Sequence, residues 1–497
     1  MNHRHLLGLD IGTTSSKAVV IDPAGRVVGS GTAPHRLATP MPGWTEQEPA
    51  EWWAASCAAI GAALAGARVN PSTIAAVGLS GQMHGAVLLD ARDDVIRPAL
   101  LWNDQRTSEH LPEIEAAAGG ERDLIRRTGN AANTGFQAPK LLWVKRHEPG
   151  NFARIRRALL PKDFVRFKLS GDALTDVGDA SGTLLFDITT RRWTTDVMQR
   201  LGLDPAWFGT VVESACIAGT VTADAARATG LSPGTPVVAG SGDNQCGAIG
   251  SGVVSPGQGL VILGTSGVVF APAQSPTPHT AGPTPGLTHA MCAADGTAAV
   301  PGSWCVTGVT LSAAGALHWF RDVVAPGESF DSLLAQAWAV PPGAQGVRCV
   351  PQFAGERCPV RDAGARAGFH GLALSHGRGH LARAVVEGVA FSLVRSIEVV
   401  RELGVTIDRL RAVGGGARSA EWLGIIASLA KLPIDRLTAE EGGAFGAALL
   451  AGVGAGVWPS AREACAESIT VSDTVEAPAP GDGLEDAYRD FLRLIAR

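Results

Sequence analysis

The sequence predicts an α/β protein of two similar domains that face each other across a cleft. Its 497 residues are enough for two or three domains, each with a core of its own. Short apolar runs that end in Gly, Ser and Thr alternate with helical patterns, which is typical of sheets covered by helices. A strand–turn–strand pattern occurs at residues 6–22 and again at residues 259–270, about half a chain later. This repetition indicates a duplicated domain.

The composition is that of an ordinary globular enzyme, with 18% charged and 45% hydrophobic residues and a formal net charge of -5. The acidic balance argues against a nucleic-acid or anionic-membrane partner. The eight cysteines are scattered without a CxxC pair, which predicts a reduced, cytoplasmic protein without a zinc site. Asp10 and Lys17 interrupt the first apolar run, so we expect no signal peptide. Residues 442–460 are uncharged but rich in Ala and Gly, and we expect a helix in a soluble core rather than a membrane span.

The first hairpin, residues 6–22, has a turn of Gly, Thr and Ser that includes Thr13 and Thr14. Such a turn points backbone N–H groups and hydroxyls into one concavity, which can hold phosphates. Asp10, at the end of the first strand, is placed to hold a magnesium ion through water. The alternative is a hairpin with a merely polar tip.

Two later apolar runs also end in polar residues. Residues 74–80 predict a buried strand that delivers Met83 and His84 between glycines, and ligands bind at such strand ends in open α/β sheets. Residues 100–106 place Trp102 before an amide, Asp104 and a guanidinium, a set suitable for a polyhydroxylated ligand. A structural histidine, and a surface ion pair of Asp104 with its neighbouring arginine, are the alternatives.

Near the middle of the chain, residues 237–248 predict a buried strand, a glycine turn and then Asp243 and Asn244. A carboxylate delivered to this position can serve as a catalytic acid or base at a cleft between two domains. The alternative is that Asp243 caps the helix that begins near Gln245, since Asp is a favoured N-cap residue.

The second half contains one further glycine-rich turn. Residues 410–413 predict a strand, and Gly415 and Gly416 follow it before a helix, so a flat ring or a phosphate could lie against bare backbone. The spacing is not that of the dinucleotide fingerprint. For the other segments we expect helices at 45–65, at 304–320, at 329–340 and at 485–497, and helices that begin at 140 and at 380. A further helix at 444–457 would close the second domain. We also expect a polar loop at 128–139 and a loop followed by a strand at 176–187.

Taken together and in order, these motifs resemble the FGGY carbohydrate kinases from Asp10 nearly to the end of the chain. The resemblance includes a second family signature that runs from residues 367–372 to 380–387. It implies two ribonuclease-H-like domains of the superfamily of sugar kinases, heat-shock chaperones and actin, with a cleft between them. Residues 1–252 would bind the sugar and phosphate and carry the catalytic Asp near their end, and residues 253–497 would bind the nucleotide.

The resemblance also implies an activity. We expect transfer of a phosphate from ATP, with Mg²⁺, to a ketose, and the nearest pattern is that of members that phosphorylate D-xylulose to D-xylulose 5-phosphate. Another ketose or a polyol (ribulose, fuculose, gluconate, glycerol) is the alternative substrate. A sugar sensor without activity and an ATPase related to chaperones or filaments are alternatives of other classes. A homodimer is common in such families, although the sequence itself leaves the oligomeric state open.

Carried over by position, the family's roles fall on particular residues. Asp243 would be the general base, and Asp10 would assist the magnesium ion. The sugar would be held by Met83, His84, Asn244 and Asp104. The phosphates would be lined by Thr13, Thr14 and Thr265, and the adenosine by Gly415, Gly416 and Ala417.

Overall fold

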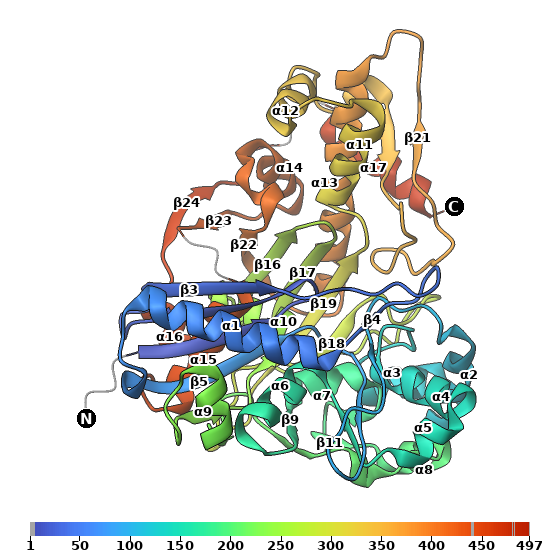
Figure 1. The fold of residues 1–497 in the computed structure, drawn as a ribbon. Coiled ribbons are helices and arrows are strands. Elements are labelled where there is room, and N and C mark those ends of the chain that lie inside the picture. Colours follow the sequence, from blue (N-terminus) through green and yellow to red (C-terminus); the bar gives the residue numbers. More distant parts are fainter. Residues whose placement is uncertain (1–4, 439–441, 480, 482, 497) are drawn as a thin grey trace.

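The computed structural model describes residues 5–438, 442–479, 481 and 483–496, which form two lobes (Figure 1). Each lobe is built on a seven-stranded sheet. In the first sheet β15 (Ser241–Gly242) pairs with β5, and the other strands follow the order β13 (Ile217–Thr220), β14 (Pro236–Val238), β5 (Ile74–Gly81), β1 (His5–Ile11), β2 (Ser15–Ile21), β3 (Val27–Pro34). The second has the order β18 (His289–Cys292), β19 (Trp304–Thr310), β17 (Gly267–Ala273), β16 (Gly257–Leu263), β22 (Ile407–Val413), β23 (Ile434–Leu437), β24 (Val471–Val475).

The two sheets share one topology, which confirms the predicted duplication. In each sheet an antiparallel hairpin (β1–β2 or β16–β17) is extended on one side by an antiparallel strand, β3 or β19. On the other side its first strand pairs in parallel with β5 or β22, and that strand pairs in parallel with β14 or β23. Parallel neighbours need a crossover, and most of these crossovers contain helices.

Helices make up much of the rest of both lobes. In the first lobe they are α1 (Pro49–Ala67), α2 (Leu111–Ala118), α3 (Glu121–Thr128), α4 (Gln137–His147), α5 (Pro149–Arg154), α6 (Pro161–Ser170), α7 (Val177–Ala180), α8 (Thr195–Leu201), α9 (Ala223–Thr229) and α10 (Asp243–Gly250). After residue 250 they are α11 (Ala314–Val324), α12 (Phe330–Trp338), α13 (Arg378–Glu402), α14 (Ala420–Ala430), α15 (Gly442–Gly454), α16 (Ala461–Ser468) and α17 (Leu484–Ile495). None of the helices described combines the length and apolar composition that crossing a bilayer requires.

Short strands complete the secondary structure. They are β4 (Glu46–Gln47), β6 (Val87–Leu89), β7 (Ala99–Leu100), β8 (Arg157–Leu159), β9 (Leu174–Asp176), β10 (Phe186–Asp187), β11 (Arg192–Trp193), β12 (Thr210–Val212), β20 (Arg348–Val350) and β21 (Gly368–His370).

Two local predictions are wrong. The helix expected at 304–320 is instead β19 followed by α11, because the β-branched residues that end the run pair with β17. The segment 176–187, expected as loop and then strand, begins with the short helix α7. The side chain of Asp176 caps α7 by accepting hydrogen bonds from the N–H groups of Gly178 and Asp179.

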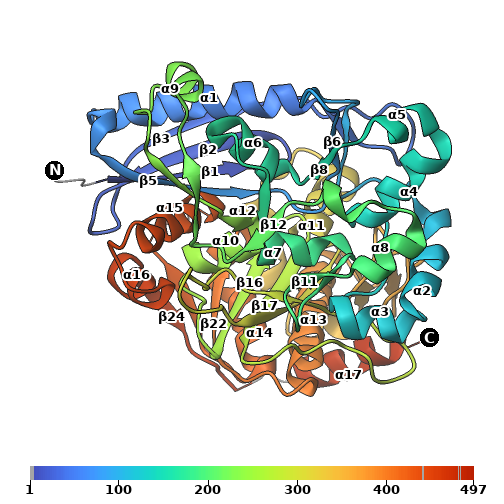
Figure 2. The same ribbon diagram turned by 90° about the horizontal axis from the view of Figure 1, so that it is seen from below.

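The helix α15 forms as predicted, but it does not close the second domain. It packs against β1 and β5 of the first sheet and against α10, opposite the face that α1 covers (Figure 2). Glycines make this contact possible. A Cβ atom on Gly446 would lie 1.8 Å from the carbonyl oxygen of Cys246, and one on Gly8 would lie 1.9 Å from that of Ala444. The helices α10 and α15 therefore lie in direct backbone contact.

This contact predicts that Gly446→Ala destabilises the protein. The added methyl group overlaps the backbone of α10, and overpacking of this kind typically costs about 1–3 kcal/mol. The matched control is Gly61→Ala on the exposed face of α1, where no atom lies within 4 Å of the new Cβ. There we expect no loss, or a gain of about 0.5–1 kcal/mol. Urea unfolding followed by circular dichroism measures both, and equal effects would contradict the account.

Candidate active site

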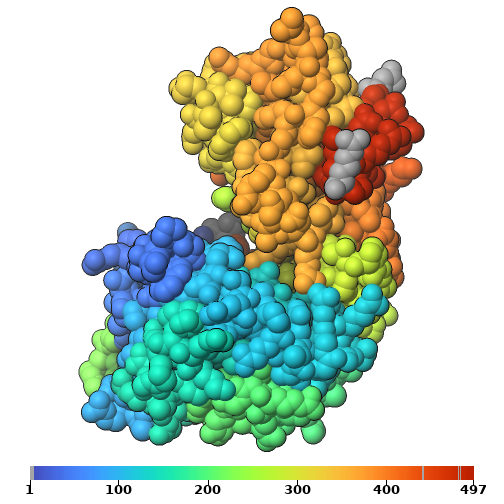
Figure 3. All heavy atoms as spheres, turned by 90° about the vertical axis from the view of Figure 1, so that its right-hand side faces the viewer, coloured from blue at the N-terminus to red at the C-terminus, as the bar shows by residue number. Residues whose placement is uncertain are grey.

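The two lobes meet at a cavity of about 210 Å³, in the region where the space-filling view narrows between them (Figure 3). Both lobes line it. The first contributes Met83, His84, Trp102, Asn133, Gly135, Phe136, Asp243 and Asn244, and the second contributes Ser266, Val268, His289, Met291, Thr307, Val309 and Arg357. Four of the residues predicted to act at the site, namely Met83, His84, Asp243 and Asn244, therefore come together here.

Asp243 is the first residue of α10, directly after β15, and it is only partly exposed. The N-cap position belongs to Gly242, so Asp243 does not cap the helix as the alternative interpretation supposed. Burial, with a further contribution from the negative charge of Asp10, raises the pKa of Asp243 to about 7. A carboxylate with this pKa can take up a proton near neutral pH.

Asp10 lies near the end of β1, close enough to Asp243 for its charge to affect the pKa of that residue. Its Oδ1 accepts a hydrogen bond of 2.7 Å from the hydroxyl of Ser80 on β5. Burial raises the pKa of Asp10, and the hydrogen bond from Ser80 and the charge of Lys17 partly oppose this. The start of α15 is close by, since a Cβ on Gly443 would lie 3.0 Å from Asp10 Oδ1.

His84 is held in an unusual conformation. Its φ angle is +69°, a left-handed value that a non-glycine residue adopts only where its surroundings enforce it. Its Nδ1 lies 2.8 Å from the carbonyl oxygen of Gly182, and because that oxygen can only accept, Nδ1 carries the proton. Burial lowers the pKa of His84 to about 3. The imidazole is therefore neutral, and its Nε2 is left as a hydrogen-bond acceptor.

Among the cavity residues that were not predicted from the sequence are Phe136, His289 and Arg357. The ring of Phe136 packs edge-on against His84, with centroids 4.7 Å apart, and against His289, at 5.7 Å. Arg357, from the second lobe, donates a hydrogen bond of 3.2 Å to Asn133 of the first lobe. Phe136 lies in the predicted polar loop at 128–139, His289 begins β18 and Arg357 lies in another loop, and no motif spacing links the three.

Asp104 lies away from this cavity. Its side chain is completely buried, and both carboxylate oxygens accept hydrogen bonds from Arg106. One of them also accepts the backbone N–H of Thr45 at 2.7 Å. The structure thus shows the ion pair with Arg106 that was the alternative to contact with a sugar, although this pair is buried and not at the surface as expected.

A second cavity of about 600 Å³ lies in the second lobe. Gly415 and Gly416 line it, as do Trp338 and Trp422, whereas Ala417 points into the hydrophobic core instead. The β16–β17 turn separates the two cavities. Ser266 of this turn lines the smaller cavity, and the carbonyl oxygen of Gly264 accepts the N–H of Ala314, which lines the larger one.

The predicted phosphate residues lie on the two hairpin turns. Thr14 and Thr265 are exposed, and Thr13 accepts a hydrogen bond of 3.1 Å from the indole of Trp102 at the smaller cavity. Each sheet thus presents a hydroxyl-rich turn, as the resemblance implied.

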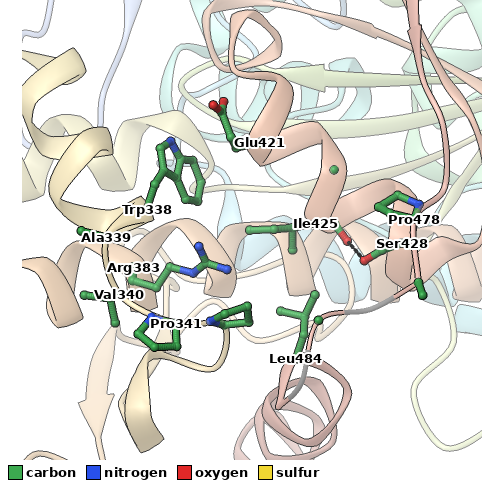
Figure 4. A pocket seen from close by; sticks show the side chains of 14 residues that line it. Trp338, Ala339, Val340, Pro341, Arg383, Glu421, Ile425, Ser428, Pro478 and Leu484 are labelled. Atoms are coloured by element: carbon green, nitrogen blue, oxygen red, sulfur yellow. Dashed lines mark hydrogen bonds between the residues drawn. The ribbon is translucent and has the colours of Figure 1, made fainter.

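A third cavity of about 470 Å³ adjoins the larger one and shares Trp338 and Glu421 with it (Figure 4). The guanidinium of Arg383 lies 5.1 Å from the centre of the Trp338 ring and forms a salt bridge of 2.6 Å with Glu387. None of the predicted site residues lines this cavity.

A buried charge cluster supports the turn that carries Asp243. The ammonium of Lys162 lies 2.6 Å from Asp163 and 3.2 Å from Asp176, and it donates a hydrogen bond to the carbonyl oxygen of Ala239. The hydroxyl of Ser241, two residues before Asp243, donates to Asp176 at 2.7 Å. The strand that leads to Asp243 is therefore tied to charges that are themselves completely buried.

Comparisons with known proteins agree with this geometry. Residues 5–250 match the model of the FGGY family of carbohydrate kinases, N-terminal domain, and residues 259–455 match that of the C-terminal domain. The xylulose kinase of Bacillus subtilis (strain 168) is 37% identical over 464 residues, which is 93% of this chain and 91% of that protein.

Two solved structures are similar along nearly their whole length. The crystal structure of a xyloylose kinase from Brucella ovis has a TM-score of 0.89 and 38% identity, and covers 99% of this chain and 98% of that one. The xylulose kinase from Rhodospirillum rubrum has a TM-score of 0.90 and 30% identity, with the same coverage. With both of its domains matched in order, the chain belongs to the FGGY family of carbohydrate kinases.

Proposed function

We propose that the protein transfers the γ-phosphate of ATP to the 5-hydroxyl of D-xylulose and forms D-xylulose 5-phosphate. The observation that carries this proposal is a carboxylate, Asp243, with a pKa of about 7 at the wall of a small cavity between the lobes. The choice of sugar rests on the relatives of at least 30% identity, which are named xylulose kinases. Ribulose, fuculose, gluconate and glycerol are less favoured.

In this scheme Asp243 accepts the proton of the attacking hydroxyl as the oxygen–phosphorus bond forms. General-base assistance of this kind contributes about 10²- to 10⁴-fold to the rate. The remainder comes from positioning, because phosphoryl transfer needs an in-line hydroxyl and neutralised charge rather than covalent help. Enclosure between the lobes keeps out water, which would otherwise compete with the sugar for the phosphate.

The sugar would be held by neutral groups. His84 Nε2 can accept a hydrogen bond from a sugar hydroxyl because Nδ1 is already committed to Gly182. The amide of Asn244 lies beside Met83, with its nitrogen 3.8 Å from the sulfur, and offers both a donor and an acceptor. The cavity volume of about 210 Å³ is large enough to hold a five-carbon sugar.

ATP would span from the larger cavity to the smaller one. Its adenosine would lie against the bare backbone of Gly415 and Gly416, and its phosphates would pass the β16–β17 turn at Thr265. Thr13 and Thr14 would face them from the first hairpin. Residues 1–252 would thus serve mainly the sugar and residues 253–497 the nucleotide, with α15 as the exception that returns to the first lobe.

The residues present fit a magnesium ion. Asp10 and Asp243 are two carboxylates close enough to interact electrostatically, in a site where burial disfavours their charge, and Mg²⁺ prefers such oxygen ligands. Asp10 would hold the ion, which when bound neutralises charge on the transferring phosphate. We further propose a cytoplasmic location, where ATP is available, and a homodimer as the oligomeric state.

A substrate panel tests the activity and the choice of sugar. ADP release with MgATP should be fastest, in kcat/KM, for D-xylulose, and Asp243→Asn should lower that value about 10²- to 10⁴-fold. Asp224→Asn is the control, because the side chain of Asp224 is 87% exposed on α9. A different preferred sugar would overturn the choice of D-xylulose. Turnover that no sugar raises above the rate with ATP alone would overturn the kinase proposal.

The pKa of Asp243 predicts how the rate depends on pH. A base must be ionised to accept a proton, and the raised pKa means that Asp243 becomes protonated as the pH falls through about 7. We therefore expect kcat/KM for D-xylulose to fall about tenfold per pH unit below this value and to level off above it. His84, with a pKa of about 3, does not contribute in this range. A profile that stays level well below pH 7 would contradict the assignment.

A substitution at His84 separates sugar binding from chemistry. Asn tolerates the left-handed backbone at this position, but its amide is too short to replace Nε2. We expect His84→Asn to raise KM for D-xylulose about 2- to 10-fold, the range for one lost hydrogen bond, and to leave KM for ATP unchanged. Steady-state kinetics with each substrate varied in turn measures this, and a change confined to ATP would argue against contact with the sugar.

A further inference from the structure

A group of possible metal ligands lies in the first lobe outside the site described above. It consists of Glu109 and His110, in the 3₁₀ turn before α2, and of His147, the last residue of α4. One ligand atom from each residue lies within 4.8 Å of the other two. The Oε1 atom of Glu109 is 2.9 Å from His147 Nε2 and 3.5 Å from His110 Nε2.

His110 is the most unusual member of this group. It is only 1% exposed, and neither of its ring nitrogens has a hydrogen-bond partner among the residues that the structure describes. Buried polar groups in proteins are nearly always paired, and an unpaired one can mark the position of a bound water or ion. Burial lowers the pKa of His110, which favours the neutral imidazole that binds metals.

The surroundings orient both rings. The other ring nitrogen of His110, Nδ1, faces Glu113 Oε2 at 3.8 Å. A carboxylate behind a metal-binding histidine is a common arrangement, because it fixes the tautomer and leaves Nε2 to bind the ion. The ring of His147 stacks on Trp143, with centroids 4.9 Å apart and planes inclined by 22°. The two imidazoles are therefore held by a buried position and by a stacked indole rather than being free surface side chains.

We propose that this cluster binds a divalent transition-metal ion, with Zn²⁺ as the best match, through Glu109, His110 Nε2 and His147 Nε2. Two imidazoles and one carboxylate are ligands typical of zinc, with a fourth position left for water, whereas Mg²⁺ and Ca²⁺ prefer oxygen ligands alone. The ion would tie the end of α4 to the turn that follows Arg106. The site does not include Asp10, and the proposal is independent of the proposed function.

Isothermal titration calorimetry with ZnCl₂ tests the proposal on the full chain, treated with EDTA and then held in excess MgCl₂. We expect one equivalent of zinc to bind. His147→Gln and Glu109→Gln should each weaken this binding at least about tenfold, and Glu113→Gln about 10- to 100-fold, as for other outer partners of metal ligands. The side chain of His147 is 42% exposed, so its variant should fold.

The control is His376→Gln, at another pair of neighbouring histidines. The rings of His376 and His380 are 5.1 Å apart, but both nitrogens of His380 already have partners in Gly377 and Gln345. Zinc should bind His376→Gln with the same affinity as the wild type. In thermal unfolding, zinc should raise the unfolding temperature of the wild type but not that of His147→Gln. Absence of zinc binding, binding unaffected by His147→Gln, or binding lost in His376→Gln would each overturn the proposal.

Discussion

The close contact between α10 and α15 is the constraint on which the arrangement of the site depends. Each of these helices follows the last parallel strand of one sheet, and small residues let their backbones touch, with Gly446 against Cys246. The contact also locates the start of each helix. α10 begins at Asp243, and the first turn of α15 lies beside Asp10. One backbone contact between the two halves of the chain therefore places both carboxylates.

The electrostatics of the site follow from that placement. Burial away from water, with a smaller contribution from the negative charge of Asp10, disfavours the charged form of Asp243, so that its pKa rises to about 7. Burial of these carboxylates lowers the stability of the fold, and buried charged residues hold the segment before Asp243 in place. Lys162 and Asp176 hold the backbone and the hydroxyl just before Asp243. The proposed base, Asp243, therefore lies at the start of a helix rather than on a free loop.

Much of this could be predicted from the sequence, because the decisive features are local. The hairpins, the glycine turn after residue 413, the long α13 and the strand that leads to Asp243 all show in the order of apolar, glycine and polar residues. Of the predictions that were wrong, the one at 176–187 missed a local N-cap by Asp176, and the others involve long-range packing. Residues 304–310 were expected to be helical, and only their pairing with β17 makes them a strand. The apolar α15 was correct as a helix, but its pattern does not say which sheet it covers.

The residues of the site also divide into those that the local sequence predicts and those that depend on the folded chain. Met83, His84, Asp243 and Asn244 follow strands and were predicted, whereas Phe136 and Arg357, from loops, and His289, from β18, come together only in the folded chain. Asp104 was ambiguous because the acid–arginine spacing suits both a ligand and an ion pair. The cluster of Glu109, His110 and His147 was missed because His147 is distant in sequence from the other two, and the cysteines, on which the expectation of no zinc site rested, do not belong to it.

The central claim is that Asp243 acts in the chemical step rather than in binding. The most direct test is single-turnover phosphorylation of D-xylulose by rapid quench with Asp243→Asn, together with calorimetric affinities for the sugar and for ATP. The account predicts that both affinities stay within about threefold of the wild type, while the rate at saturation falls about 10²- to 10⁴-fold. A variant that loses affinity for D-xylulose but keeps its rate at saturation would contradict it.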